Sequence, residues 1–174
     1  MTQSTYQDGI ALAHRVLLQT RHLLTLAQKQ VGETDLTEGT VLEAKLAPDM
    51  FAFAKQVQLV SDNAKGLYGR VTGQAVPSMQ DTEASIDELL ARIDTTIAYV
   101  SGGHAVLSDS EIESLAISFP WMPGKQISGH DYLVDLAIPN LYFHFSMVYA
   151  ILRAQGISVG KMDYLGDVRF VDAA

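Results

Sequence analysis

Four stretches of this chain place apolar residues three or four positions apart, and this spacing limits the possible folds more than any other feature. Residues at such steps lie on one face of an α-helix, so each stretch predicts a helix with one side to bury. The predicted helices cover residues 6–31, 50–71, 86–100 and 128–151. Helices with this spacing pack nearly aligned, with the side chains of one between those of the next. The sequence therefore predicts an all-α chain that folds as a four-helix bundle.

Local patterns suggest where these helices begin and end. Pro48 and Asp49 suit the first turn of the second helix, where proline loses no hydrogen bond and a carboxylate is favoured. Asp81 is a plausible cap for the third helix. Ser128 has an acid three residues later, as in a capping box, and Gly32 is placed to close the first helix.

The connections between the predicted helices differ in length. A polar loop at 32–46 joins the first two helices, and about seven residues around Pro77 join the next two. The third connection, 101–127, is far longer than usual. Within it, Ser110 could begin a short helical turn, and 115–119 is typical of an extended segment. A long loop in a small domain is often a functional cover.

Composition narrows the class of protein. A length of 174 residues predicts one domain spanning 1–174, and 48% hydrophobic residues are enough for a core. With 20 acidic and 12 basic residues, the net charge of −8 argues against a nucleic-acid partner, which requires a basic surface. The chain has no cysteine, which excludes disulfide frameworks, thiolate metal sites and cysteine nucleophiles.

Membrane insertion is not expected. The first twenty residues lack a basic start followed by an uninterrupted apolar core, so they do not predict a signal peptide. The segment 133–152 approaches the length of a membrane span, but polar side chains interrupt it. We interpret it as a helix buried in the bundle and expect a cytoplasmic protein with no membrane partner.

Asn140 and His144 are the most informative candidates for a functional site. They lie four residues apart on the predicted fourth helix, on a face that is otherwise apolar. Burying an amide and an imidazole costs a few kcal/mol each unless both are hydrogen-bonded or bind something. One interpretation is a ligand or metal pocket inside the bundle. The other is a structural polar network, in which Asn140 meets the carbonyl group left without a donor by Pro139.

Other polar residues give weaker evidence for a functional site. Pro139 lies inside the fourth helix and predicts a kink at the middle of the bundle. Gln56, Gln58 and Asp62 flank the apolar stripe of the second helix, where an amide and a carboxylate could complete a metal site with His144 or simply face solvent. The remaining histidines have no metal-ligand spacing, and the chain lacks the GxSxG, Walker and GxGxxG motifs.

Longer stretches of the sequence resemble a known family. They are LAPDMF at 46–51, QVQ at 56–58, AKG at 64–66, IPNLYFH at 138–144, YAILR at 149–153 and GKMDYLG at 160–166. These stretches are similar to an uncharacterised bacterial family, a domain of unknown function within the DinB/YfiT-like superfamily. The resemblance covers nearly the whole chain. It implies a four-helix bundle with up-down-down-up connectivity, in which the long connection lies between the third and fourth helices as the sequence already predicts, and it implies a homodimer.

The resemblance also implies a position for a metal. The superfamily holds a divalent ion with three histidines, one from the second helix and two from the last helix at four-residue spacing. His144 matches the second histidine of the last helix, Asn140 stands at the first, and Gln58 stands at the second-helix position, or Gln56 if the alignment shifts. Imidazole binds Zn²⁺ and Ni²⁺ well, whereas amide oxygens bind them weakly. We therefore expect a degenerate metal site at these residues.

Three functional hypotheses remain open. The first, which we favour, is a DinB-like protein that binds a small molecule in the bundle core around Asn140 and His144 without a tightly bound metal. The second is a metal-dependent enzyme resembling the thiol transferases and isomerases of the superfamily, with Zn²⁺ or Ni²⁺ as cofactor. The third is a dimeric interaction module built on the aromatic fourth helix. A pocket that holds the two residues and is closed by the long loop with Trp121 would favour the first two.

Overall fold

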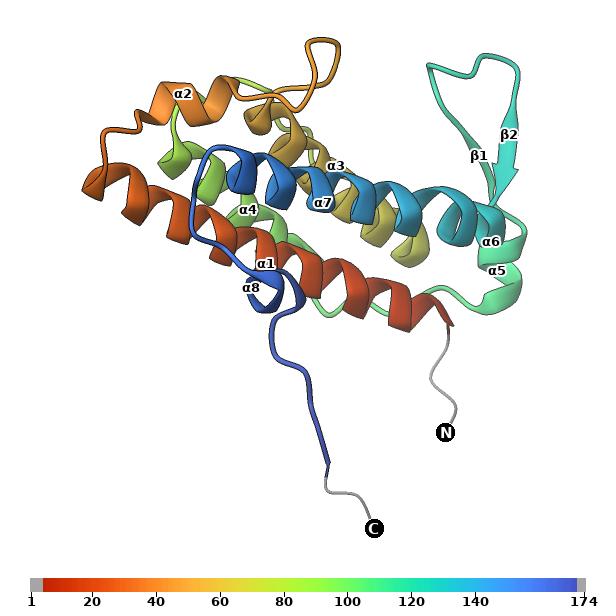
Figure 1. The fold of residues 1–174 in the computed structure, drawn as a ribbon. Helices are drawn as coiled ribbons and strands as arrows, with labels where there is room; N and C mark the ends of the chain where they lie inside the picture. The colour runs from red at the N-terminus through yellow and green to blue at the C-terminus, as the bar shows by residue number, and fades with distance from the viewer. Residues whose placement is uncertain (1–4, 172–174) are drawn as a thin grey trace.

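Four long helices lie side by side in the computed structural model, which describes residues 5–171 (Figure 1). They are α1 (Thr5–Glu33), α3 (Phe53–Thr72), α4 (Ile86–Val100) and α7 (Ile138–Ala154). The apolar residues of the four predicted stripes meet in one core between these helices. The prediction of a mostly helical chain is therefore confirmed.

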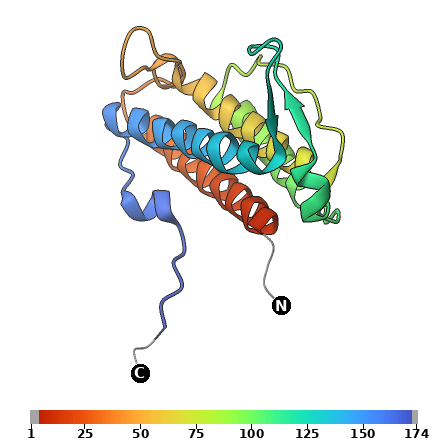
Figure 2. The same cartoon turned by 90° about the vertical axis from the view of Figure 1, so that its right-hand side faces the viewer.

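Side-chain contacts show how the long helices run past one another. Successive residues of α1 contact progressively earlier residues of α4, so these two helices are antiparallel, whereas α3 and α4 run the same way. The connection at 73–85 therefore returns along the bundle before α4 begins (Figure 2). The pairs are Gln28 with Asp87 and Arg21 with Asp94 between α1 and α4, and Ser61 with Thr96 and Tyr68 with Tyr99 between α3 and α4.

The helix boundaries correct three expectations. Gly32 does not end α1, which continues to Glu33. Pro48 and Asp49 lie in a turn before α3, which begins only at Phe53. The cap of α4 is Ser85, whose hydroxyl accepts from the backbone N–H of Glu88. Asp81, the expected cap, instead pairs with two cationic side chains, because an ion pair satisfies its carboxylate better than a distant helix end.

Short elements occupy the connections. The first loop contains α2 (Glu38–Glu43), which the polar composition of 32–46 did not suggest. The long connection contains α5 (Asp109–Glu113), whose capping box is formed by Ser108 and Glu111 rather than by Ser110. After the chain turns back, α8 (Lys161–Leu165) lies against α1, and Arg15 donates to the carbonyl of Leu165 at 2.6 Å.

A hairpin projects from one end of the bundle, beside α6 (Figure 1). Its strands are β1 (Ala116–Ser118) and β2 (Gln126–Ser128), paired antiparallel. The expected extended segment at 115–119 thus includes β1, while its pairing with β2 was not predicted. Ser128 caps α6 (Gly129–Asp131) by accepting from the N–H of Asp131, as expected.

A π-helical turn directly precedes Pro139, the residue at which the sequence predicts a kink. Between α6 and α7 the chain forms the π-helix η1 (Tyr132–Ala137), and the N–H of Ile138 donates to the carbonyl of Leu133, five residues earlier. Proline cannot donate to the carbonyl four residues before it, and a wider turn accommodates that lost bond. The π-helical turn leads from the hairpin end of the bundle, where Tyr132 accepts from Arg70 of α3, to Pro139, whose neighbour Asn140 faces the middle of α3.

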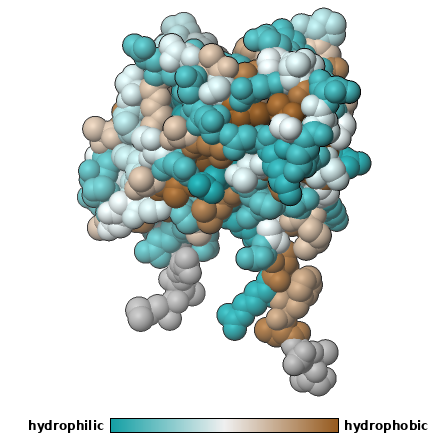
Figure 3. Space-filling model, turned by 90° about the vertical axis from the view of Figure 1, so that its left-hand side faces the viewer, coloured by the Kyte–Doolittle hydropathy of each residue, from teal (hydrophilic) through white to brown (hydrophobic). Residues whose placement is uncertain are grey.

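The chain after α8 leaves the body of the bundle, and apolar side chains remain exposed along it (Figure 3). They are Val168, Phe170 and Val171, with exposed fractions of 39%, 84% and 79%. Among the described residues, no helix is both long enough and apolar enough to cross a membrane.

Candidate functional site

Two polar pairs cross the seam between α3 and α7. Nδ1 of His144 lies 2.8 Å from Oε1 of Gln56. One turn earlier on α7, Nδ2 of Asn140 donates to Oδ1 of Asn63 at 2.8 Å. Later residues of α3 thus face earlier residues of α7, so these helices are antiparallel. The structure brings Asn140 and His144 to one face, as their spacing predicted.

The hydrogen bonds of Gln56 determine which nitrogen of His144 carries the proton. Nε2 of Gln56 donates to the carbonyl of Phe51 at 3.3 Å, so the amide oxygen faces the imidazole. A carbonyl oxygen can only accept, and Nδ1 of His144 must therefore be the protonated nitrogen. Nε2 of the neutral ring is left as a hydrogen-bond acceptor and a base.

His144 is held in its neutral form by its surroundings. Burial, followed by the nearby charge of Lys55, lowers the pKa of His144 below its ordinary value of 6.5. Lys55 is itself paired with Asp81 at 2.5 Å, on the same side of α3. A buried imidazole with a depressed pKa is available as an acceptor at neutral pH.

The free nitrogen of His144 opens to the surface. Within residues 5–171, only Nε of Arg92 is a buried side-chain polar atom without a partner, and Nε2 of His144 makes no hydrogen bond there. Nε2 is therefore accessible although the residue is 7% exposed. The exposed ring of Phe143 meets the imidazole edge to face, with 5.2 Å between the ring centroids. Phe51, whose side chain is also exposed, contacts Gln56 through its backbone carbonyl.

The side chain of Asn140 bonds across the seam to Asn63. It does not bond to the carbonyl group that Pro139 leaves without a donor. Asn63 donates from Nδ2 to the carbonyl of Leu59 at 2.7 Å, so its oxygen is directed toward Asn140. Asn140 uses its amide N–H₂ in that contact, and its own Oδ1 has no partner in the described part of the chain. The seam thus offers two acceptors four residues apart on α7, Oδ1 of Asn140 and Nε2 of His144.

Gln58 lies on a different face of α3 from Gln56. Its Nε2 donates to Glu83 at 2.8 Å, within a charged cluster between α3, α4 and the connection at 79–83. Arg92 is the centre of this cluster, and its guanidinium is almost fully buried. The carboxylates that contact Arg92 are Asp62 at 2.8 Å, Asp81 at 3.1 Å and Glu83 at 2.8 Å. The structure therefore brings His144 together with Gln56 and does not bring it together with Gln58 or Asp62.

The donor set at the seam does not fit the three-histidine metal site of the superfamily. His144 supplies one imidazole, and Gln56 already engages its Nδ1. The side chains beside it are amides, which bind Zn²⁺ and Ni²⁺ weakly. In the part of the chain described by the structure, no three histidine, aspartate or glutamate side chains form a group that could hold a metal ion.

Trp121 does not close a pocket over Asn140 and His144, the arrangement that would have favoured the first two hypotheses. It lines a hollow formed by the hairpin and Leu136, whose lining residues include neither Asn140 nor His144. Sequence reasoning also missed Asn63. That residue lies seven positions after Gln56, on the same face of α3. A polar stripe with this spacing was the signal that could have identified it.

The comparisons with known proteins agree with the fold and say little about chemistry. The crystal structure of a DinB family member protein from Shewanella denitrificans matches with a TM-score of 0.85 and 31% sequence identity, over 97% of this chain and 95% of that chain. No curated protein matches the chain. A model of a domain of unknown function, DUF1993, matches residues 5–165. The chain therefore belongs to the DUF1993 family, and its fold is that of a DinB-like protein.

Proposed function

We propose that this DinB-like protein binds a small neutral molecule at the seam between α3 and α7, around Asn140 and His144. One observation carries the proposal: Gln56 fixes the proton on Nδ1 of His144 and leaves an accessible, unprotonated Nε2 on a ring that packs against the exposed Phe143. A histidine sealed inside the core would need partners for both ring nitrogens within the protein, whereas Nε2 of His144 is left for a ligand or solvent.

The chemistry of the seam suggests what kind of molecule would bind. Oδ1 of Asn140 and Nε2 of His144 are both acceptors, so a ligand should present O–H or N–H donors. Phe143 is 52% exposed and Phe51 is 56% exposed, and such rings gain by covering an apolar or aromatic ligand. A planar molecule with two donors matches this arrangement. The charge of Lys55 argues against a cationic ligand.

A matched pair of probes tests the proposal. Resorcinol has an aromatic ring with two hydroxyl donors, and 1,3-dimethoxybenzene has the same ring without donors. We expect resorcinol to shift the NMR resonances of the His144 ring and the Asn140 side-chain amide saturably, and the dimethoxy compound to bind roughly ten-fold more weakly because it makes no hydrogen bonds.

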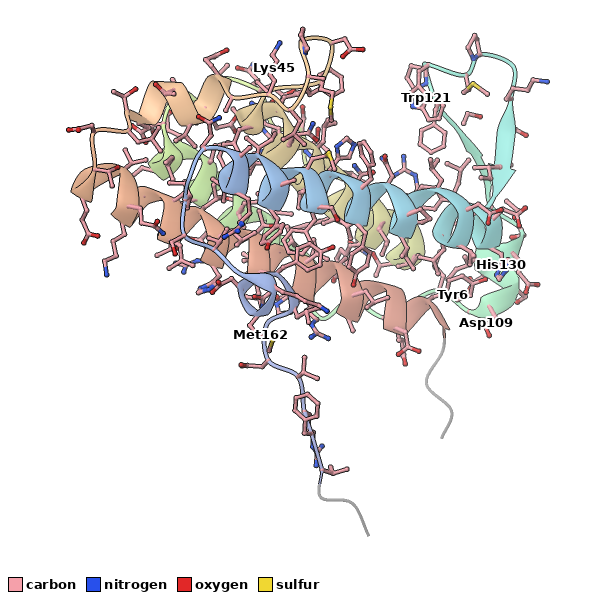
Figure 4. The ribbon with its side chains drawn as sticks, in the orientation of Figure 1. Tyr6, Lys45, Asp109, Trp121, His130 and Met162 are labelled. Carbon is pink, nitrogen blue, oxygen red and sulfur yellow. The ribbon has the colours of Figure 1, made fainter. Side chains whose placement is uncertain are left out.

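Variants complete the experiment. His144→Phe and Asn140→Leu remove the two acceptors. His130→Phe is the matched control, because His130 is exposed in α6 (Figure 4). The proposal predicts loss of resorcinol binding in the first two variants alone. Equal binding of both probes, or equal binding by all variants, would contradict it.

We further propose that the metal site of the superfamily is degenerate in this protein, supported by the amides that stand beside His144. The enzyme hypothesis would regain support from one metal ion per chain.

The up-down-down-up connectivity and the homodimer implied by the resemblance are also proposed. The antiparallel α1–α4 and α3–α7 pairs and the parallel α3–α4 pair support the connectivity. In a dimer, the exposed Phe143 would pack between protomers instead of covering a ligand, and sedimentation of wild type beside Phe143→Lys tests this alternative.

A further inference from the structure

The β1–β2 hairpin encloses an apolar hollow that is separate from the α3–α7 seam. Its volume is about 320 Å³, within the usual range for pockets that hold small molecules. The hairpin provides most of the wall, and Leu136 of η1 closes one side. Figure 4 shows the side chain of Trp121 on the side of the hairpin that faces along the bundle.

The hollow leaves large apolar side chains in water. Trp121 is 62% exposed and Met122 is 44% exposed. The ring of Phe119 lies 5.1 Å from that of Trp121, so the two form a continuous aromatic wall. Apolar surface gathered in a concave site is stabilised when a ligand covers it.

The hairpin carries one positive charge and no negative charge. The chain has a net charge of −8, yet residues 114–130 contain no aspartate or glutamate, and Lys125 is their one lysine or arginine. Lys125 lines the hollow. Behind the wall, the guanidinium of Arg70 lies 5.3 Å from the centre of the Phe119 ring. The hairpin is thus a cationic, carboxylate-free region on an acidic protein, which favours an anionic ligand.

We propose that this hollow binds a small anionic amphiphile: an apolar chain or ring that ends in a single carboxylate. The apolar body would cover Trp121, Met122 and Leu136, and the carboxylate would pair with Lys125. This site lies beyond the proposed function, because it shares no residue with the Asn140 and His144 seam.

The sequence provides a direct reporter for the test. Trp121 is the sole tryptophan of the chain, so the tryptophan fluorescence of the whole protein comes from this wall. Octanoate, 1-octanol and octylammonium share one chain length and differ in charge. We expect octanoate to shift the emission to shorter wavelength saturably, and to bind more tightly than octylammonium by at least about three-fold, the scale of an exposed ion pair.

Two matched pairs of variants locate the binding. Met122→Glu places a carboxylate in the hollow and should weaken octanoate binding about ten-fold or more, whereas Met162→Glu alters a similarly exposed methionine on α8. Lys125→Gln should remove the preference for octanoate over octylammonium, whereas Lys45→Gln, in the loop after α2 and away from the hairpin, should preserve it (Figure 4).

The same titration can overturn the proposal. Equal binding of octanoate and octylammonium to the wild type would contradict the charge argument, and unchanged binding in Met122→Glu would place the ligand elsewhere. An emission shift produced by phosphatidylcholine–phosphatidylglycerol vesicles, but not by octanoate, would make the hairpin a membrane-contact surface instead.

Discussion

His144 and Gln56 form the contact on which the seam depends. The pair lies between α3 and α7, with Gln56 1% exposed, so water cannot replace either partner easily. A buried polar group that loses its partner destabilises the protein by more than the net strength of the bond itself. Substitution of either residue should therefore lower the stability of the whole protein as well as weaken ligand binding.

We expect His144→Ala to lower the free energy of unfolding by about 2 kcal/mol, because Oε1 of Gln56 is left buried without a donor and a cavity forms. Urea unfolding of wild type and variant measures the change. His130→Ala is the control, with an expected change within about 0.5 kcal/mol because that side chain is exposed. Equal stability of the two variants would rule out the buried pair.

The depressed pKa of His144 also predicts a pH dependence. The pKa is near 6.5 in the unfolded chain and lower in the folded protein, mainly through burial. As the pH falls below about 6.5, the unfolded chain takes up this proton first, and the free energy of unfolding decreases. The contribution is complete above that pH and is lost as the pH falls toward the folded pKa.

Urea unfolding at about pH 8 and about pH 5.5 measures this dependence. His144→Gln has no titrating group at this position and should show a smaller loss of stability between the two conditions. His130→Gln is the control, because His130 lies on the surface and has no charged partner among the described residues. If the loss is the same in wild type and His144→Gln, this histidine does not titrate differently on folding.

At the scale of helices and loops, Arg92 attaches the connection between α3 and α4 to those two helices. Its guanidinium donates to Asp62 of α3, to Glu83 and to the carbonyl of Gln80. Burial acts to raise the pKa of Glu83, but the contact with Arg92, together with the hydrogen bond from Gln58 and a backbone hydrogen bond, brings that pKa below its ordinary value. The parallel α3 and α4 require a long connection, and this cluster fixes it in place.

We expect Arg92→Met to lower the free energy of unfolding by about 2 kcal/mol, since Glu83 loses its buried partner while the more exposed Asp62 and Asp81 are screened by solvent. Arg21→Met is the matched control, because the Arg21–Asp94 pair is half exposed and should contribute little. Limited proteolysis should cleave 73–85 faster in the Arg92 variant alone. Equal cleavage would show that the cluster does not hold this connection.

At the scale of the whole molecule, the metal content of the purified protein distinguishes the binding hypothesis from the enzyme hypothesis. We expect native mass spectrometry of tag-free protein to find less than one metal ion per chain, and added Zn²⁺ or Ni²⁺ to leave the melting temperature unchanged, because one imidazole among amides binds these ions weakly. His144→Ala is measured alongside. One ion per chain in wild type, absent from the variant, would favour the metal-dependent enzyme.

Sequence by itself determined the four long helices, because apolar spacing and helical geometry are both local properties. It also determined that Asn140 and His144 share a face, since four residues make about one turn. The identity of their partners was beyond its reach, because the relative rotation and direction of two helices depend on the packing of the whole core.

Tertiary structure decided what those residues contact. It placed Gln56 rather than Gln58 opposite His144, since two residues along a helix turn the side chain to the other face. It also engaged Asp81 in an ion pair rather than a cap, and it moved Trp121 from the seam to a separate hollow. These outcomes depend on residues far apart in the chain, and only the folded chain brings such residues within hydrogen-bonding distance.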